Sequence, residues 1–148
     1  MVRTCRALLP VLLLALLVAA LGTACGGSSD PAPAGPDAAA AAVPDAVSAA
    51  EAGELFQTGG YTLVDVRETV ETDQQQVEGS LLIPLGEVEA RMGEVPDDRP
   101  VLVLCRSGSR AVPAAEAMRA AGRQATVVEG GIVAWAEAGL PYVGAAPS

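Results

Sequence analysis

Blocks of apolar residues alternate with polar blocks along most of the chain, and each block predicts a helix or a strand. Ser48, followed three residues later by Glu51, is typical of a helix start, so VSAAEAGELF predicts a short helix that ends at the glycines 59–60. The apolar, β-branched segment YTLVDVR (61–67) predicts a strand. The polar residues that follow, through Gln76, predict a helical piece.

The middle of the chain continues this alternation. LLIPL (81–85) predicts a second strand that is stopped by Pro84. GEVEARMGEV predicts a helix, because Val88 and Met92 are four residues apart and would share one face. VLVLC (101–105) is the most apolar segment and shows no alternation, which is typical of a central parallel strand buried on both faces.

The last part of the chain predicts two more helices with a strand between them. Ala111, Ala115 and Met118 share one face of the first helix, ATVVEGG predicts the strand, and IVAWAEAGLP predicts the final short helix. Strands that alternate with helices at this spacing favour an open α/β sheet with right-handed crossovers. We therefore expect an α/β fold.

The N-terminal part has a different composition. Arg3 and Arg6 precede an apolar stretch of about fifteen residues, which is short for a membrane span of roughly twenty, and small residues then lead to Cys25. Residues 1–24 resemble a bacterial lipoprotein signal peptide, in which Cys25 becomes the lipid attachment site. An ordinary secretory signal cut near Ala24 is the alternative. Both interpretations predict an exported protein, and the first predicts a lipid anchor at the cell membrane or cell envelope.

A segment rich in alanine, proline, glycine and serine follows the predicted signal. Such residues offer little to bury, so 25–44 is expected to be a tether. The folded domain is then expected to span 45–144, with a short tail at 145–148.

Composition excludes several kinds of function. The chain has nine arginines and no lysine, eighteen acidic residues, no histidine and a net charge of −9, so we expect no nucleic-acid partner. The lack of histidine excludes Cys–His and Ser–His–Asp catalysis, and together with a single thiol in the domain it excludes nearly every kind of zinc site. No metal or cofactor is expected. Cys5, Cys25 and Cys105 lie in three different settings and predict no disulfide framework.

Cys105 lies where the predicted central strand ends and a helix begins, the edge at which α/β sheets bind ligands. The loop after it contains two arginines, two serines and a glycine: Arg106, Ser107, Gly108, Ser109 and Arg110. Such residues can curl so that successive N–H groups point inward, and the next helix adds the positive end of its dipole. This arrangement would favour a thiolate over a thiol. From the loop alone, a structural cysteine that ends a core strand is the alternative.

Four blocks together resemble a single-domain rhodanese. They occur in the order and spacing of that family and cover roughly residues 47–143. The blocks are DVR at 65–67, the glycine and IPL of EGSLLIPL at 78–85, RPVLVLCRSGSR at 99–110 and EGGIVAWAEAGLP at 129–141. The resemblance implies an open, mainly parallel five-stranded sheet flanked by helices.

The resemblance also implies a chemistry and a set of roles. Members of the family are sulfurtransferases that take sulfane sulfur from a small anionic donor such as thiosulfate and pass it to a thiophilic acceptor such as cyanide. Cys105 matches the nucleophile that carries the persulfide, and residues 106–110 match the loop that binds persulfide and substrate. Asp65 and Arg67 match a pair that we interpret as mainly structural.

Further matches concern packing beside the site. Gly130, Gly131 and Trp135 match positions that shape this packing, and Trp135 is expected in the core rather than against a ligand. Many relatives carry Gly-His-Ile before the second strand, where this chain has Gln75-Gln76-Val77. That difference leaves open the part of this segment in partner or substrate selection.

Alternative functions remain at this point. Certain phosphatases and arsenate reductases have a similar fold, but in their Cys-x5-Arg loops five residues separate the cysteine from the arginine. Only four residues separate Cys105 from Arg110. A tetrahedral oxyanion needs a wider ring of donors than one sulfur atom, so sulfur transfer is favoured. A non-catalytic rhodanese module that binds a partner or carries persulfide sulfur to it is a second alternative. A membrane-tethered reductase is disfavoured by the lack of a second thiol in the domain. We expect a monomer.

Overall fold

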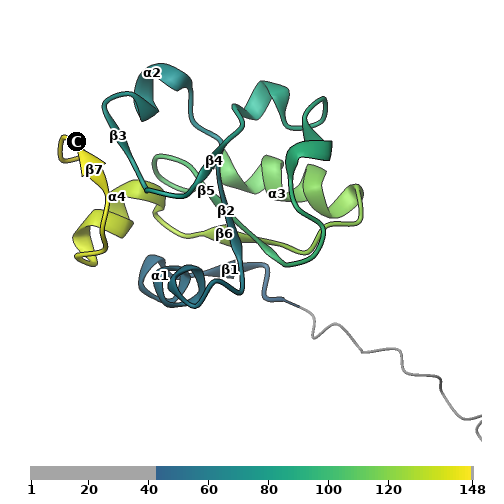
Figure 1. Cartoon of the computed structure of the whole chain (residues 1–148), viewed down its shortest axis with the longest axis horizontal. Helices are drawn as coiled ribbons and strands as arrows, with labels where there is room; N and C mark the ends of the chain where they lie inside the picture. The colour runs from purple at the N-terminus through teal and green to yellow at the C-terminus, as the bar shows by residue number, and fades with distance from the viewer. Residues whose placement is uncertain (1–42, 148) are drawn as a thin grey trace, which may run out of the picture. The chain divides into compact units, whose positions relative to one another are not determined.

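Five short parallel strands form the centre of the protein in the computed structural model, which describes residues 43–147 (Figure 1). All four neighbouring pairs run parallel, in the order β1-β6-β5-β2-β4. The strands are β1 (Ala46–Val47), β2 (Thr62–Asp65), β4 (Leu81–Leu82), β5 (Val101–Leu104) and β6 (Ala125–Val128). The predicted five-stranded, mainly parallel α/β fold is confirmed, and β5 is the central strand.

Helices cover both faces of the sheet (Figure 1). One face packs against α3 (Ala111–Ala120), and the other packs against α1 (Ala49–Gln57) and α4 (Gly131–Glu137). The start of α1 is as predicted, since the Ser48 hydroxyl accepts a hydrogen bond from the Glu51 N–H at 3.2 Å.

Strand β5 is buried on both faces, as its unbroken apolar sequence predicts. Val101, Val103 and Cys105 pack on the α3 side, while Leu102 and Leu104 pack on the side of α1 and α4. Burial of a Val or Leu side chain stabilises a fold by about 1.5–3 kcal/mol. The strand therefore holds the start of the loop after it in a fixed position.

The prediction of a helix over GEVEARMGEV is wrong. The segment forms two single turns of 3₁₀ helix, η1 (Leu85–Glu87) and η2 (Met92–Glu94). Gly86 and Gly93 lie in these turns, and each glycine disfavours a continuous α-helix by about 1 kcal/mol. Val88 is nevertheless buried in the core, so the apolar spacing reports burial rather than helix type.

The polar segment after β2 is helical only in part. Helix α2 (Thr69–Thr72) is four residues long, and Gln75–Gln76 then form strand β3. Strand β3 pairs antiparallel with β7 (Val143–Gly144), near the C-terminus (Figure 1). Local polarity could not predict this pairing, because the two partners are far apart in the sequence.

Other expectations concern the N-terminal region. The predicted signal peptide, Cys5, Cys25 and nearly all of the tether lie outside the described residues. Within residues 43–147, no helix is both long and apolar enough to cross a membrane.

Candidate active site

Cys105 directly follows the central strand and lies beneath the loop that leads to α3. Its exposed fraction is 1%, so the thiol is recessed rather than displayed. The Gly108 N–H donates a hydrogen bond to Cys105 Sγ at 3.1 Å. Gly108 has φ +96°, a left-handed conformation that favours glycine and lets the loop turn back over the sulfur. The loop thus directs at least one main-chain donor at the candidate nucleophile.

Helix α4 holds the other side of this loop. The Ile132 N–H donates to the Cys105 carbonyl at 2.8 Å, and the Val133 N–H donates to the Arg106 carbonyl at 3.3 Å. Because a peptide unit is planar and trans, the N–H groups that follow these two carbonyls point away from α4. Gly131 makes this approach possible, since a Cβ there would lie 2.3 Å from the Cys105 carbonyl oxygen.

Arg110, the last loop residue, is tied to helix α2. Its guanidinium donates to both carboxylate oxygens of Glu71, at 2.6 and 2.7 Å. This hydrogen-bonded contact with Arg110 lowers the pKa of Glu71 from its ordinary 4.5 to about 2, and burial opposes the shift only in part. The same contact raises the pKa of Arg110. The charge of Arg110 is therefore matched by Glu71, which makes this side chain a brace of the loop.

Glu71 is a site residue that the sequence does not reveal. Its carboxylate also accepts the Glu68 N–H at 3.1 Å at the start of α2, so it is held by its own helix as well as by Arg110. The Glu-x-x-Glu spacing could have indicated this helix start. It could not have indicated Arg110, which is 39 residues further along the chain.

The remaining loop residues line two hollows on opposite parts of the loop. Ser107 and Gly108 line a hollow of about 430 Å³ whose other lining residues are partly apolar, such as Val112, and partly acidic, namely Asp45 and Glu129. Arg106, which is exposed, lines a smaller hollow of about 100 Å³. Ser109 is exposed as well. The Cys105 loop therefore borders a wide hollow on one part and a narrow hollow on another.

The predicted Asp65–Arg67 pair lies at the end of β2, beside the end of β5. Both side chains are fully buried and form an ion pair. Asp65 accepts from the Arg67 main-chain N–H at 3.1 Å and from Arg67 Nε at 3.0 Å, while Arg67 Nη2 donates to the Gln75 carbonyl at 2.9 Å. The pair therefore attaches β3 to the end of the main sheet. Removing one partner of such a buried pair costs about 3–5 kcal/mol.

Trp135 lies in the core on the α1 and α4 face and is 1% exposed. Its Nε1 donates to the Pro141 carbonyl at 3.0 Å, and its ring packs edge-on against Phe56 with centroids 6.3 Å apart. The structure brings Cys105, its loop and the end of β2 together, and it places Trp135 in the packing behind α4.

The sequence matches one protein family and is similar to several known proteins. The rhodanese-like domain family matches residues 48–138. A protein named sulfurtransferase from Allochromatium vinosum is 38% identical over 90 residues, which are 60% of this chain and 84% of that protein. The HTH-type transcriptional regulator Rv0324 of Mycobacterium tuberculosis is 36% identical over 106 residues, 70% of this chain but 46% of the regulator. The chain thus spans most of the first relative and less than half of the second.

Solved structures agree on the fold. The crystal structure of a rhodanese-related protein from Thermoplasma volcanium superimposes with a TM-score of 0.62 at 33% identity, covering 66% of this chain and 96% of that one. Reduced CoADR-RHD from Bacillus anthracis gives a TM-score of 0.59 at 35% identity, covering 64% of this chain and 17% of that larger chain.

Proposed function

Because the chain belongs to the rhodanese-like domain family, we propose that it is a sulfurtransferase that carries sulfane sulfur as a persulfide on Cys105. The donor is thiosulfate or a similar small anion, and the acceptor is a thiophile such as cyanide. Relatives named as sulfurtransferases support the general class of reaction.

The proposed reaction is a double displacement with a covalent intermediate. The Cys105 thiolate attacks the outer sulfur of thiosulfate, a new S–S bond forms, and the old S–S bond breaks as sulfite leaves with the electron pair. The acceptor then attacks the outer persulfide sulfur, and Cys105 leaves again as the thiolate. In each of the two steps one electron pair of the incoming nucleophile forms the new bond and one pair departs with the leaving group, so no external oxidant is needed.

One observation carries the proposal: the 3.1 Å hydrogen bond from the Gly108 N–H to Cys105 Sγ. A main-chain donor aimed at a sulfur stabilises negative charge there, and a fixed donor needs no reorganisation when that charge forms. Both the thiolate and the persulfide are anions. The compact loop between Cys105 and Arg110 also supports sulfur over a tetrahedral oxyanion as its ligand.

A second candidate is a module that carries persulfide sulfur only for a bound partner. The 1% exposure of Cys105 favours it, because a recessed sulfur is reached only by reactants that fit the surrounding loop. Both candidates require the persulfide. They differ in whether free cyanide can remove the outer sulfur at a useful rate.

Intact-mass spectrometry of the full chain tests the proposal. After thiosulfate treatment we expect a gain of about 32 Da, one sulfur atom, that peptide mapping places on Cys105 and that cyanide removes. Cys105→Ser should show no gain at that peptide and no thiosulfate:cyanide sulfurtransferase activity. Cys25→Ser is the matched control, and it should gain sulfur on Cys105 and show sulfurtransferase activity as the wild type does. Full turnover by Cys105→Ser would refute the proposal.

We further propose export with lipidation at Cys25, so that the domain is held at a membrane in the cell envelope. The apolar segment and the small residues before Cys25 support this. Metabolic labelling with radioactive palmitate should mark the wild-type chain and leave Cys25→Ser unlabelled. Equal labelling of both chains would contradict lipidation at this residue.

A further inference from the structure

The wide hollow beside the Cys105 loop shares a wall with the nucleophile. Ser107 and Gly108 line the hollow, and the Gly108 N–H is also the group that donates to Cys105 Sγ at 3.1 Å. The hollow therefore lies beside the sulfur rather than around it. Its volume of about 430 Å³ is within the range of sites that hold small organic groups, about 300–1,000 Å³. A partner seated there would lie next to the nucleophile.

An apolar side chain is exposed at this hollow. Val112, the second residue of α3, lines it and is 46% exposed. Val112 is one of the three large apolar side chains that are exposed in residues 43–147, with Val70 and Val143. Apolar surface left open in a concave site is typical of a place that a partner covers.

The charged residues that line the hollow are both acidic, Asp45 and Glu129. Glu129 is exposed and takes part in none of the ion pairs formed among residues 43–147. Asp45 has Arg119 at 3.5 Å, but its carboxylate is 93% exposed, and exposed pairs of this kind are weak. Even when Arg119 is counted in full, the two carboxylates leave an excess of one negative charge.

These properties restrict what can occupy the hollow. An apolar side chain suits the exposed face of Val112, and an ammonium or guanidinium group complements the carboxylates. A second copy of this chain is a poor partner, because its net charge is −9. A small anionic sulfur donor is repelled by the same carboxylates. The hollow therefore suits the acceptor of the sulfur rather than its donor.

We propose that this hollow is the docking site of the sulfur acceptor: a protein segment that places an apolar and a basic side chain there and presents a cysteine thiol to Cys105. This inference rests on the proposed function. The acceptor thiol loses its proton to solvent, and its thiolate attacks the outer sulfur of the persulfide. A new S–S bond forms, and the bond to Cys105 Sγ breaks with its electron pair left on Cys105.

Three synthetic peptides with one cysteine each test the inference. The first is acetyl-Cys-Gly-Leu-Arg-amide, the second has glutamate in place of its arginine, and the third has glycine in place of its leucine. Three extended residues span about 10 Å, enough to join a thiol at the persulfide to a side chain in the hollow. The measurement is the rate at which each peptide removes the outer sulfur from the thiosulfate-treated full chain, followed by intact-mass spectrometry.

The wild type should distinguish the peptides by charge and by apolar surface. The arginine peptide should remove sulfur roughly tenfold faster than the glutamate peptide at about 0.02 M salt, and the ratio should narrow at about 0.5 M salt because exposed charges are screened. The glycine peptide should be roughly fivefold slower than the leucine peptide, because it makes no apolar contact with Val112.

Two variants separate these preferences. Glu129→Gln should reduce the preference for arginine over glutamate roughly threefold and keep the preference for leucine. Val112→Ala should reduce the preference for leucine and keep the preference for arginine. Each preference is a ratio within one variant, so a general change in the reactivity of Cys105 cancels. Glu54→Gln is the matched control, because Glu54 is exposed on α1 at the opposite face of the sheet, and it should keep both preferences.

The outcomes distinguish this inference from the proposed function. If the wild type gains persulfide and passes its sulfur to cyanide but shows no preference among the peptides, this inference alone fails. It also fails alone if Glu129→Gln and Val112→Ala both keep the preferences of the wild type. If thiosulfate puts no sulfur on Cys105, the proposed function fails and this inference fails with it.

Discussion

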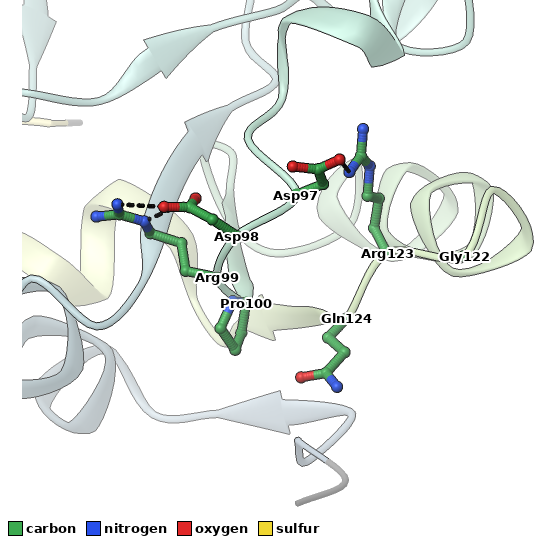
Figure 2. A pocket seen from close by; sticks show the side chains of 7 residues that line it. All are labelled: Asp97, Asp98, Arg99, Pro100, Gly122, Arg123 and Gln124. Carbon is green, nitrogen blue, oxygen red and sulfur yellow. Dashed lines mark hydrogen bonds and ion pairs between the residues drawn. The ribbon is translucent and has the colours of Figure 1, made fainter. Parts of the chain in front are cut away.

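The two ends of the central strand carry hollows of nearly equal size but different linings. At the amino end of β5 a pocket of about 420 Å³ is lined by Asp97, Asp98, Arg99, Pro100, Gly122, Arg123 and Gln124 (Figure 2). At the carboxyl end a hollow of about 430 Å³ lies beside the Cys105 loop. Volume alone does not distinguish the two ends.

Charge and main-chain geometry distinguish them. Figure 2 shows the charged side chains of the amino-end pocket turned toward one another: Arg99 pairs with Asp98 at 2.6 Å and Arg123 pairs with Asp97 at 3.6 Å. The hydrogen bond from Arg99 lowers the pKa of Asp98, but exposed pairs of this kind contribute little to stability. The carboxyl end instead directs an N–H group at a thiol. Open α/β sheets bind ligands at the carboxyl ends of their strands, and the candidate site around Cys105 lies at that end.

The largest expected difference between the ends comes from one added methyl group. Gly131→Ala puts a Cβ against the Cys105 carbonyl and Arg106, so the loop must move, and a shift of about 1 Å costs about 100-fold in rate. Gly122→Ala at the other end should lower the free energy of unfolding by about 1–3 kcal/mol, because the new residue must adopt a positive φ but meets no neighbouring atom. Steady-state kinetics and urea unfolding of both variants check this. Equal activities would show that the contact of Gly131 with the loop is unimportant.

A smaller difference is expected when one carboxylate is neutralised at each end. Glu71→Gln removes the charge that holds Arg110, and we expect kcat to fall by roughly tenfold as the loop loosens. Asp97→Asn in the amino-end pocket should leave kcat unchanged and alter the free energy of unfolding by less than about 0.5 kcal/mol. Stopped-flow or steady-state assays on the two variants measure the contrast. A larger loss of kcat in Asp97→Asn would reverse the comparison.

The smallest expected effect is the pH dependence of the Glu71–Arg110 ion pair at the carboxyl end. The pKa of Glu71 is lowered to about 2, so its ion pair stabilises the folded state fully above pH 4.5 and is lost as the pH falls toward 2. The gap in unfolding free energy between wild type and Glu71→Gln should be about 1 kcal/mol or less near neutral pH and should close over that interval. Urea titrations from pH 7 to pH 2 measure it. A gap that stays constant down to pH 2 would contradict the assigned pairing.

Local sequence signals were enough to predict four of the five strands and the Cys105 loop, whereas the fifth strand, β1, followed only from the family resemblance. The unbroken apolar run of β5 indicated burial on both faces, and Ser48 with Glu51 indicated the start of α1. These features depend on neighbours within a few residues, which is why a single sequence contains them. The position of Cys105 at the end of β5 follows from the same signals.

Contacts between segments that are distant in the sequence could not be predicted from such local signals. The Glu71–Arg110 pair spans 39 residues, and the pairing of β3 with β7 joins Gln76 to Val143, so both depend on how the finished sheet folds. The spacing of Val88 and Met92 led to a wrong prediction of an α-helix for another reason. Two 3₁₀ turns also direct Val88 into the core and leave Met92 partly buried, and Gly86 and Gly93 within these turns disfavour a continuous α-helix.

The burial of Cys105 also affects whether its thiol can form a disulfide with a second copy of the protein in the presence of oxygen. A disulfide requires two Cβ atoms to approach to about 3.8 Å. A sulfur that is 1% exposed and covered by its own loop cannot come that near to its counterpart in another copy. The shape of the folded domain therefore disfavours oxidative cross-linking of two copies through this thiol.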